Sequence, residues 1–288
     1  MITRGKNRST LILEAAIHDI VDERAPITVR GVAYALFTQK LIDSMETKNT
    51  QKVSRVMTAM RERNDLDWTL VVDDSRMTNI VSAWSDPNQI IDACVREYRK
   101  DYWRDQSITV EIWSEKGTVY GLLRPVLDEL GVTFRVMKGF GSFTAVRQAA
   151  EDTWASDDKD FIAFYIGDHD PSGMYMTEVD LPERLQRYGA RGRFQRIAIT
   201  EEDFHLPSFD ARTKKKDPRY QWFVKRYGYD CWELDAINPN ELRRRVREQI
   251  ESCINLPLWE RAIKVEKAEV ESMKDFHNHW KQLMGVSK

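Results

Sequence analysis

Two aspartates separated by one residue follow an apolar run near the middle of the chain. The run in FIAFYIGDHDPSG, residues 161–173, is typical of a strand buried on both faces, and it leads Asp168 and Asp170 into a Pro-Ser-Gly turn. A third acidic residue, Glu115, follows the apolar stretch SITVEIW within WSEKG. Ligands of open α/β sheets bind at the carboxyl ends of strands, and neighbouring carboxylates favour a cation between them. Three hard oxygen ligands suit Mg²⁺ or Mn²⁺, so the pattern predicts metal-assisted phosphodiester chemistry.

Each of these acidic residues also has a simpler explanation. An Asp-x-Asp pair often turns a loop and caps the following helix, and Glu115 on its own resembles any surface carboxylate. Their joint position at strand ends favours the metal site, provided that the first and third strands of this region are neighbours. For His169, between the aspartates, we expect a contact with the metal ligands or with a phosphate rather than a metal bond.

The elements that must position these residues alternate between strands and helices from residue 107 onward. Helices are expected at 117–131, 142–155 and 176–189, and strands at 107–113, 132–140, 160–167 and 193–200. Such alternation implies right-handed crossovers and a mostly parallel, Rossmann-like α/β sheet. A charged helical tail follows between residues 238 and 284.

The first third of the chain is expected to be helical. Apolar spacing predicts helices at 9–23, 27–42 and 49–64, followed by a short strand at 68–74. Three helices and a strand or wing are typical of a winged-helix (CAP-like) DNA-binding module. Lys48, Lys52 and Arg55 share one face of the third helix, where they are expected to lie against DNA phosphates, although a solvated helix face explains them equally well.

These patterns predict three regions: a winged-helix domain at residues 1–85, a linker helix at 86–106, and an α/β domain with a helical extension at 107–288. The net charge of −2 does not by itself indicate a polyanionic partner, so only local clusters of basic residues can indicate nucleic-acid binding. Three cysteines, far apart, argue against a disulfide framework. No apolar stretch is long enough to span a bilayer and the start of the chain has no signal-peptide pattern, so we expect a cytoplasmic protein without membrane contact.

The order WSEKG then GDHDPSG, within alternating strands and helices, resembles the Toprim domain of topoisomerases, primases and several nucleases. More narrowly, it is similar to the A subunit of topoisomerase VI and the related meiotic double-strand-break protein. The segment KGFGSFTAVR, residues 138–147, is similar to that family's Gly-rich, Arg-containing segment. A GDHDPSG loop with a later ELDA segment, Glu233 to Ala236, also resembles Toprim proteins of phages and mobile elements. The resemblance extends from about Thr28 to Ala236, and the acidic motifs are its most specific part.

The resemblance implies roles for individual residues. Glu115 would be a metal ligand or the acid/base that acts on the leaving 3′ oxygen, and Asp168 and Asp170 would hold Mg²⁺ or Mn²⁺. Tyr34 would be the nucleophile, with Arg30 one helical turn before it in TVRGVAY. A phenol has an ordinary pKa near ~10 and needs activation. Lys138, at the start of the Gly-rich segment, is the remaining expected DNA contact.

The sequence departs from that family at two points: Ala33 precedes Tyr34 where the family has adjacent aromatic residues, and the chain is shorter than a full A subunit.

The expected activity is Mg-dependent cleavage of double-stranded DNA, leaving a 5′-phosphotyrosyl bond and a free 3′-OH. The resemblance implies a homodimer in which Tyr34 of one protomer faces the acidic residues of the other. No P-loop motif is present, so any ATPase would be a separate subunit.

Two alternatives stay open. A hydrolytic Toprim nuclease would use the same metal site with water as nucleophile, leaving Tyr34 a structural role. A non-catalytic DNA-binding component would use the winged helix alone. The sequence does not decide whether the segment Glu233 to Ala236 belongs to the site.

Overall fold

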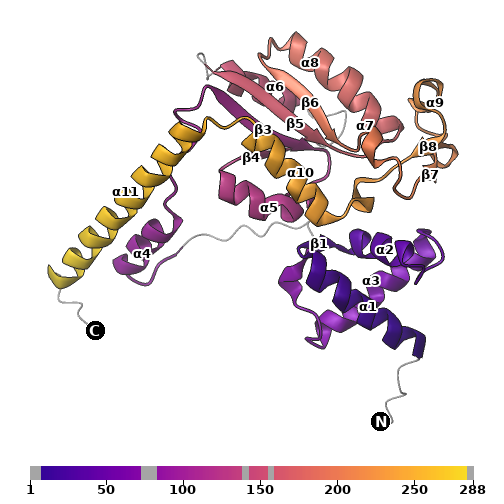
Figure 1. The fold of residues 1–288 in the computed structure, drawn as a ribbon, viewed down its shortest axis with the longest axis horizontal. Helices are drawn as coiled ribbons and strands as arrows, with labels where there is room; N and C mark the ends of the chain where they lie inside the picture. Colours follow the sequence, from indigo (N-terminus) through magenta and orange to yellow (C-terminus); the bar gives the residue numbers. More distant parts are fainter. Residues whose placement is uncertain (1–7, 73–82, 138–142, 155–158, 284–288) are drawn as a thin grey trace.

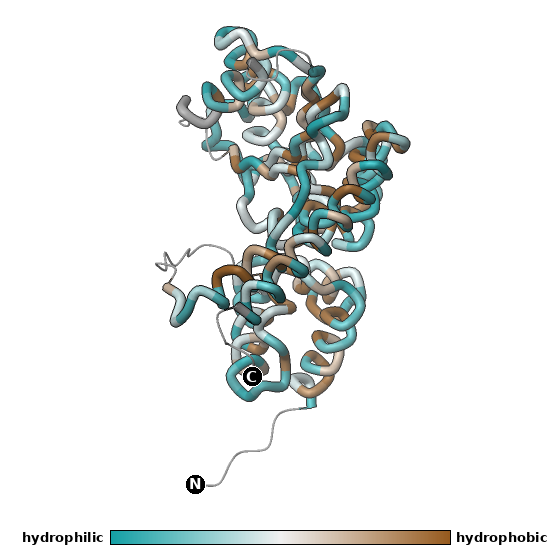
Figure 2. Tube along the Cα trace, turned by 90° about the vertical axis from the view of Figure 1, so that its left-hand side faces the viewer, coloured by the Kyte–Doolittle hydropathy of each residue, from teal (hydrophilic) through white to brown (hydrophobic). Residues whose placement is uncertain are grey.

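The computed structural model describes residues 8–72, 83–137, 143–154 and 159–283. Its N-terminal part packs around its own core, in which Ile17, Leu36 and Met57 are fully buried. Its elements are α1 (Arg8–Arg24), β1 (Ile27–Thr28), α2 (Val29–Thr38), α3 (Thr47–Glu62), the 3₁₀ turn η1 (Trp68–Leu70) and β2 (Val71–Val72). Hydrophobic and hydrophilic residues alternate along the helices (Figure 2), as expected for helices with one buried face. The three helices expected from the sequence are confirmed.

Side-chain caps explain where two of these elements differ from expectation. The Thr28 hydroxyl accepts a hydrogen bond from the Gly31 N–H at 2.9 Å, so α2 begins at Val29 rather than at residue 27. Asp67 caps η1 by accepting from the Thr69 N–H at 2.8 Å. Of the expected strand at 68–74, residues 68–70 therefore form this turn, Val71 and Val72 form β2, which pairs in parallel with β1, and residues 73 and 74 lie outside the described residues.

A four-stranded parallel sheet lies at the centre of the molecule (Figure 1). Its strands are β3 (Ile108–Ser114), β4 (Thr133–Val136), β5 (Asp160–Ile166) and β6 (Arg193–Ala198), in the order β4-β3-β5-β6. The condition on which the metal-site interpretation depended, that the first and third strands are neighbours, is met, because Ser114 of β3 lies opposite Ile166 of β5. The segments that carry Glu115 and Asp168 therefore leave the sheet at the same edge.

Helices cover both faces of this sheet (Figure 1). They are α5 (Thr118–Leu130), α6 (Phe143–Trp154), α7 (Pro171–Tyr175), the π-helical turn η2 (Met176–Asp180), α8 (Leu181–Arg187) and α10 (Pro239–Glu251). Because side chains alternate along a strand, Ile112 and Phe164 pack toward α5 and α10. Trp113 and Tyr165 join the opposite core, which includes Leu181 of α8. The mixed α/β fold with a parallel sheet is thus confirmed.

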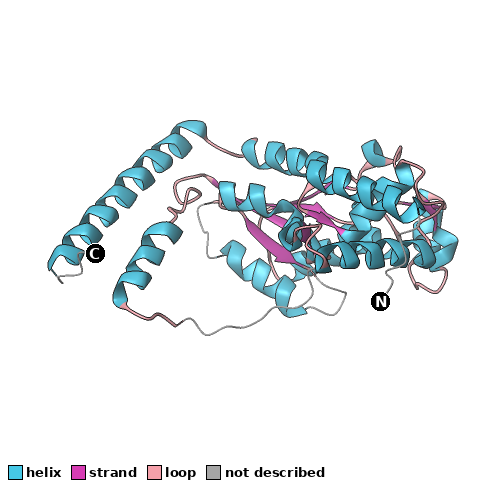
Figure 3. Cartoon of the chain, turned by 90° about the horizontal axis from the view of Figure 1, so that it is seen from below, coloured by secondary structure: helices cyan, strands magenta, loops and turns pink. Residues whose placement is uncertain are grey.

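The remaining elements extend from this body. A small unit follows β6 and includes η3 (Glu201–Asp203), β7 (Phe209–Asp210), η4 (Ala211–Lys214), α9 (Tyr220–Tyr227), β8 (Asp230–Cys231) and η5 (Leu234–Ala236). Helices α4 (Pro87–Glu97) and α11 (Leu256–Leu283) lie side by side and project from the sheet (Figures 1 and 3). Hydrogen bonds from Tyr98 to Glu269 and from Tyr102 to Glu266, both 2.7 Å, hold the segment after α4 against α11. None of the helices in the described ranges combines the length and apolar character that crossing a bilayer requires.

Candidate active site

The three acidic residues expected to bind metal lie at the ends of neighbouring strands. Glu115 follows β3, whereas Asp168 and Asp170 follow β5, and only 6% and 1% of the two aspartates is exposed. Burial, followed by the charges of Asp168 and Asp170, raises the pKa of Glu115 to about 7. Because Ser114 of β3 lies opposite Ile166 of β5, the structure places the expected trio at one edge of the sheet.

Lysine side chains neutralise two of these carboxylates. The Lys116 ammonium donates to Asp168 Oδ1 at 2.8 Å and to Asp235 Oδ2 at 3.1 Å. The Lys214 ammonium forms an ion pair with Asp170 Oδ2. Burial opposes the charge of each lysine, but the carboxylates prevail and raise the pKa of both. Lys116 and Lys214 were not expected as site residues.

The donor type of the trio fits a hard divalent cation, because carboxylate oxygens are the ligands that Mg²⁺ and Mn²⁺ prefer. In the side-chain positions seen here, however, the described residues contain no group of three or more His, Cys, Asp or Glu that could hold a metal ion. The two ammonium groups occupy one oxygen of each aspartate. Metal binding at this site therefore requires lysine side chains to move.

Asp170 also caps the helix that follows it. Its Oδ1 accepts from the Gly173 N–H at 2.8 Å and from the Ser172 hydroxyl at 3.0 Å. Burial alone would raise the pKa of Asp170, but Lys214 and the Gly173 N–H lower it below its usual value. Position 173 must be glycine, because a Cβ atom there would lie 2.3 Å from the Asp168 carbonyl oxygen. The helix-capping explanation thus holds for one oxygen of Asp170 and leaves the other facing Lys214.

Arg196 of β6 fixes the loop that carries the aspartates. Its guanidinium donates to the carbonyl oxygens of Gly167, Asp168 and Gly173 at 2.7, 3.2 and 3.2 Å. Burial lowers the pKa of Arg196, while nearby Tyr165 and the acidic groups oppose that change. Arg196 therefore supports the backbone of the site, a role that the sequence did not indicate.

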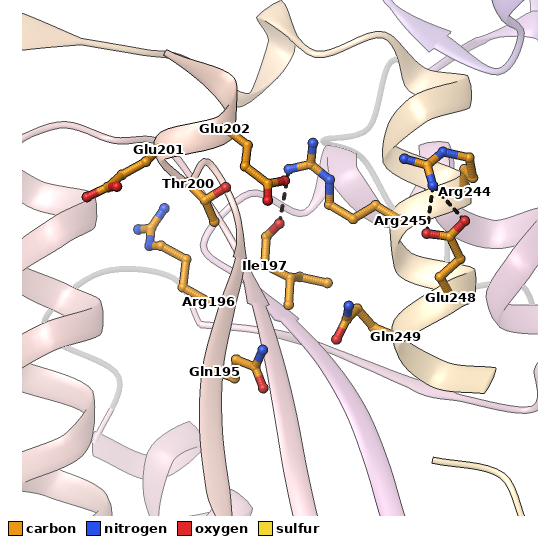
Figure 4. A pocket seen from close by; sticks show the side chains of 10 residues that line it. All are labelled: Gln195, Arg196, Ile197, Thr200, Glu201, Glu202, Arg244, Arg245, Glu248 and Gln249. Atoms are coloured by element: carbon orange, nitrogen blue, oxygen red, sulfur yellow. Dashed lines mark hydrogen bonds and ion pairs between the residues drawn. The ribbon is translucent and has the colours of Figure 1, made fainter. Parts of the chain in front are cut away.

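A pocket of about 510 Å³ lies beside β6 and α10 (Figure 4). Arginines line it, but each has partners within the protein. Arg245 donates to Asp203 at 2.9 Å and to the Ile197 carbonyl oxygen at 3.2 Å, and Arg244 pairs with Glu248 at 2.6 Å. Because carboxylates already neutralise Arg244 and Arg245, the pocket is a weak candidate for binding phosphate.

Arg30 and Tyr34 of α2 both contact Glu233. The Arg30 guanidinium pairs with the Glu233 carboxylate through Nε and Nη2, the latter at 2.6 Å from Oε1. The Tyr34 hydroxyl donates to Glu233 Oε2 at 3.2 Å. Burial of Tyr34, and then the charge of Glu233, raises the pKa of the phenol, so Tyr34 is neutral in this state.

The segment after β8 joins these residues to the acidic trio. The Leu234 N–H donates to Asp168 Oδ1 at 2.8 Å, directly after Glu233 in the chain. Asp235 accepts from the Thr28 hydroxyl at 2.8 Å and from Lys116. The resemblance implied that Tyr34 faces the acids of another protomer, whereas here residues 233–235 link Tyr34 to the acids of its own chain. The segment whose role was left open is thus part of the candidate site.

Arg243 of α10 reinforces this attachment of the N-terminal part. Its guanidinium donates to the carbonyl oxygens of Arg24, Ala25 and Pro26 at 3.0, 3.1 and 3.2 Å. These carbonyls belong to the last residue of α1 and to the two residues before β1. The position of the N-terminal part relative to the sheet therefore does not depend on Glu233 alone.

The expectation for His169 is wrong in this structure. Only 3% of the residue is exposed, and its ring lies among aromatic rings of Phe204, Phe223, Tyr227 and Trp232. Burial lowers the pKa of His169 to about 4, so it is neutral at physiological pH. An enclosed, neutral imidazole is not in position to contact a phosphate, and it supports the core beneath the loop instead.

The expected DNA-binding residues of α3 are exposed. Lys48, Lys52 and Arg55 lie on this helix, and none forms an ion pair with another residue that the structure describes. Lys138 lies outside the described residues.

Comparison of the chain with protein-family models, with curated proteins and with solved structures finds no match.

Proposed function

We propose that this chain is a metal-dependent DNA-cleaving protein of the topoisomerase VI A type. Its N-terminal part would be a winged-helix domain and its parallel sheet a Toprim domain. The observation that carries the proposal is the link, through residues 233–235, between Tyr34 and Arg30 on α2 and the acidic residues at the sheet edge. A buried tyrosine linked to an acidic strand edge would provide a nucleophile beside the proposed metal site.

The reaction proposed is attack of the Tyr34 oxygen on a DNA phosphate, with departure of the 3′ oxygen. Asp168 and Asp170 would hold Mg²⁺ or Mn²⁺, which would supply Lewis-acid stabilisation of the phosphate. Of the two roles expected for Glu115, metal ligand or acid/base, we propose the second: burial raises its pKa to about 7 in the protein without metal, which suits it to give a proton to the 3′ oxygen. The products would be a 5′-phosphotyrosyl bond and a free 3′-OH.

The proposal is tested by incubating the protein with supercoiled plasmid and Mg²⁺ or Mn²⁺, followed by protease treatment and end-labelling. We expect cleaved DNA with protein attached at the 5′ ends, and no cleavage by Glu115→Gln. Tyr34→Phe should abolish the covalent product. Tyr102→Phe is the matched control, because it loses a tyrosine–glutamate hydrogen bond of 2.7 Å at α11. Intact plasmid with either metal would refute the proposal.

A second candidate is a hydrolytic Toprim nuclease. The observation that favours it is the Tyr34 hydroxyl itself, which is buried, neutral and hydrogen-bonded to Glu233 as a structural tyrosine would be. This nuclease would cleave without a covalent intermediate, and Tyr34→Phe would leave the rate unchanged. Double-stranded DNA is the proposed partner in both cases. Two sites in a homodimer would give a double-strand break, and any ATPase would be a separate chain.

A further inference from the structure

Glu233 contacts both of the residues that the proposed reaction needs on α2. Its carboxylate receives two hydrogen bonds from Arg30, and Tyr34 donates to Oε2 at 3.2 Å. The Glu233 side chain is 16% exposed and that of Arg30 is 44% exposed, so DNA can approach Arg30 from solvent. Glu233 is thus the carboxylate that meets the tyrosine hydroxyl.

A tyrosine that attacks phosphorus must lose its proton. Burial and the negative charge of Glu233 raise the pKa of Tyr34, so the phenol is not ionised before the reaction begins. The proton must instead leave as the new bond forms, and a group within hydrogen-bond reach must accept it. Glu233 Oε2 already accepts that hydrogen bond. Arg30 fixes the orientation of the acceptor through its bidentate contact.

We infer that Glu233 is the catalytic base that takes the proton from Tyr34, an inference that rests on the proposed function. As the bond between the Tyr34 oxygen and phosphorus forms, the phenolic proton passes to Glu233 Oε2. The bond between phosphorus and the 3′ oxygen breaks, and its electron pair stays on that oxygen, which takes a proton from Glu115. Resealing is the reverse: Glu233 returns the proton to Tyr34 and Glu115 recovers its own.

The test must distinguish this role from simple positioning of Tyr34. Glu233→Gln suits that purpose, because the amide oxygen still accepts the tyrosine hydrogen bond but does not take up the proton. Thr28, Asp235 and Arg243 keep their contacts in this variant and continue to hold α2 in place. Glu233→Asp provides a second variant, which keeps a carboxylate. Glu248→Gln is the matched control, since Glu248 is a 55% exposed partner of Arg244 on α10.

The substrate is DNA with a single 3′-bridging sulfur at the cleaved phosphate. A thiolate leaves without protonation, so the reaction no longer needs Glu115 as acid, and only the attack step depends on pH. The rate of covalent adduct formation is measured in single turnovers from pH 6 to 9. The affinity of each variant for the same DNA and its melting temperature are measured alongside.

For wild type we expect an adduct rate that stays flat above pH 7. For Glu233→Gln the rate at pH 7 should be at least about 100-fold lower, a typical loss for a general base, and should rise about tenfold per pH unit as hydroxide replaces the missing acceptor. Glu233→Asp should keep the flat profile, and Glu248→Gln should match wild type. If the pH profile of the adduct rate for Glu233→Gln runs parallel to that of wild type, Glu233 is not the base, and the proposed function is unaffected. No adduct with wild type would overturn the proposed function, and this role with it.

Discussion

Replacing Glu115 by glutamine should stabilise the protein above pH 7. The pKa of Glu115 is raised from 4.5 to about 7, so the folded state binds this proton more tightly than the unfolded state. The stability that the protonated group contributes is complete below pH 4.5 and is lost as the pH rises through 7. At roughly 1.4 kcal/mol per pKa unit, the loss is about 3 kcal/mol. Glutamine does not ionise, so the variant avoids this loss.

The assay is urea unfolding of wild type and Glu115→Gln at pH 5 and at pH 8.5 without divalent metal. The difference in unfolding free energy should move in favour of the variant by about 2 to 3 kcal/mol between the two pH values. Glu248→Gln, an exposed control, should show no such change. A difference that does not vary with pH would refute the raised pKa of Glu115, and with it the burial of this carboxyl group beside the two aspartates.

Three further predictions concern metal, DNA and assembly. Lys214→Met removes the ammonium that competes for Asp170, so Mn²⁺ binding measured by titration calorimetry should tighten about tenfold. Lys216→Met is the control and should bind Mn²⁺ like wild type. An unchanged Mn²⁺ affinity of Lys214→Met would contradict the competition. The second prediction concerns the three exposed cationic residues of α3, Lys48, Lys52 and Arg55. Changing all of them to glutamine should weaken DNA binding. It should also reduce the slope of the logarithm of the binding constant against the logarithm of the salt concentration by about 2 to 3 in magnitude, and an unchanged slope would exclude phosphate contact. Within one chain, residues 233–235 link Tyr34 to the acidic residues. A mixture of the Tyr34→Phe and Glu115→Gln variants should therefore not cleave DNA. Cleavage by the mixture would show that the site forms between protomers.

The sheet edge could be predicted because its signals are local. Apolar runs mark β3 and β5, and parallel strands end at the same edge, so Glu115 and Asp168 were expected at that edge. That the two strands are direct neighbours is known only from the fold. The error at His169 has an equally local cause. Side chains alternate along extended backbone, and Asp170 is extended with φ −148° and ψ 173°, so the residue between two site-facing aspartates faces the core.

The partners of these residues could not be predicted, because long separations in the chain hide them. Lys116 meets Asp168 across 52 positions, Lys214 meets Asp170 across 44, and Tyr34 meets Glu233 across 199. Lys116 stands beside Glu115 in WSEKG, which was the one available signal for it. Three consecutive lysines precede Asp217, and only the fold shows that Lys214 is the one that reaches the site.

The most direct measurement of the central claim is the identity of the residue that carries DNA after cleavage. The protein is incubated with DNA and Mn²⁺, denatured, treated with nuclease to leave a short nucleotide remnant, and digested for peptide mass spectrometry. We expect a nucleotide mass on the peptide containing Tyr34, attached through a 5′-phosphate, and its disappearance in Glu115→Gln. Cleaved DNA with an unmodified Tyr34 peptide, or with the remnant on a different residue, would show that Tyr34 is not the nucleophile.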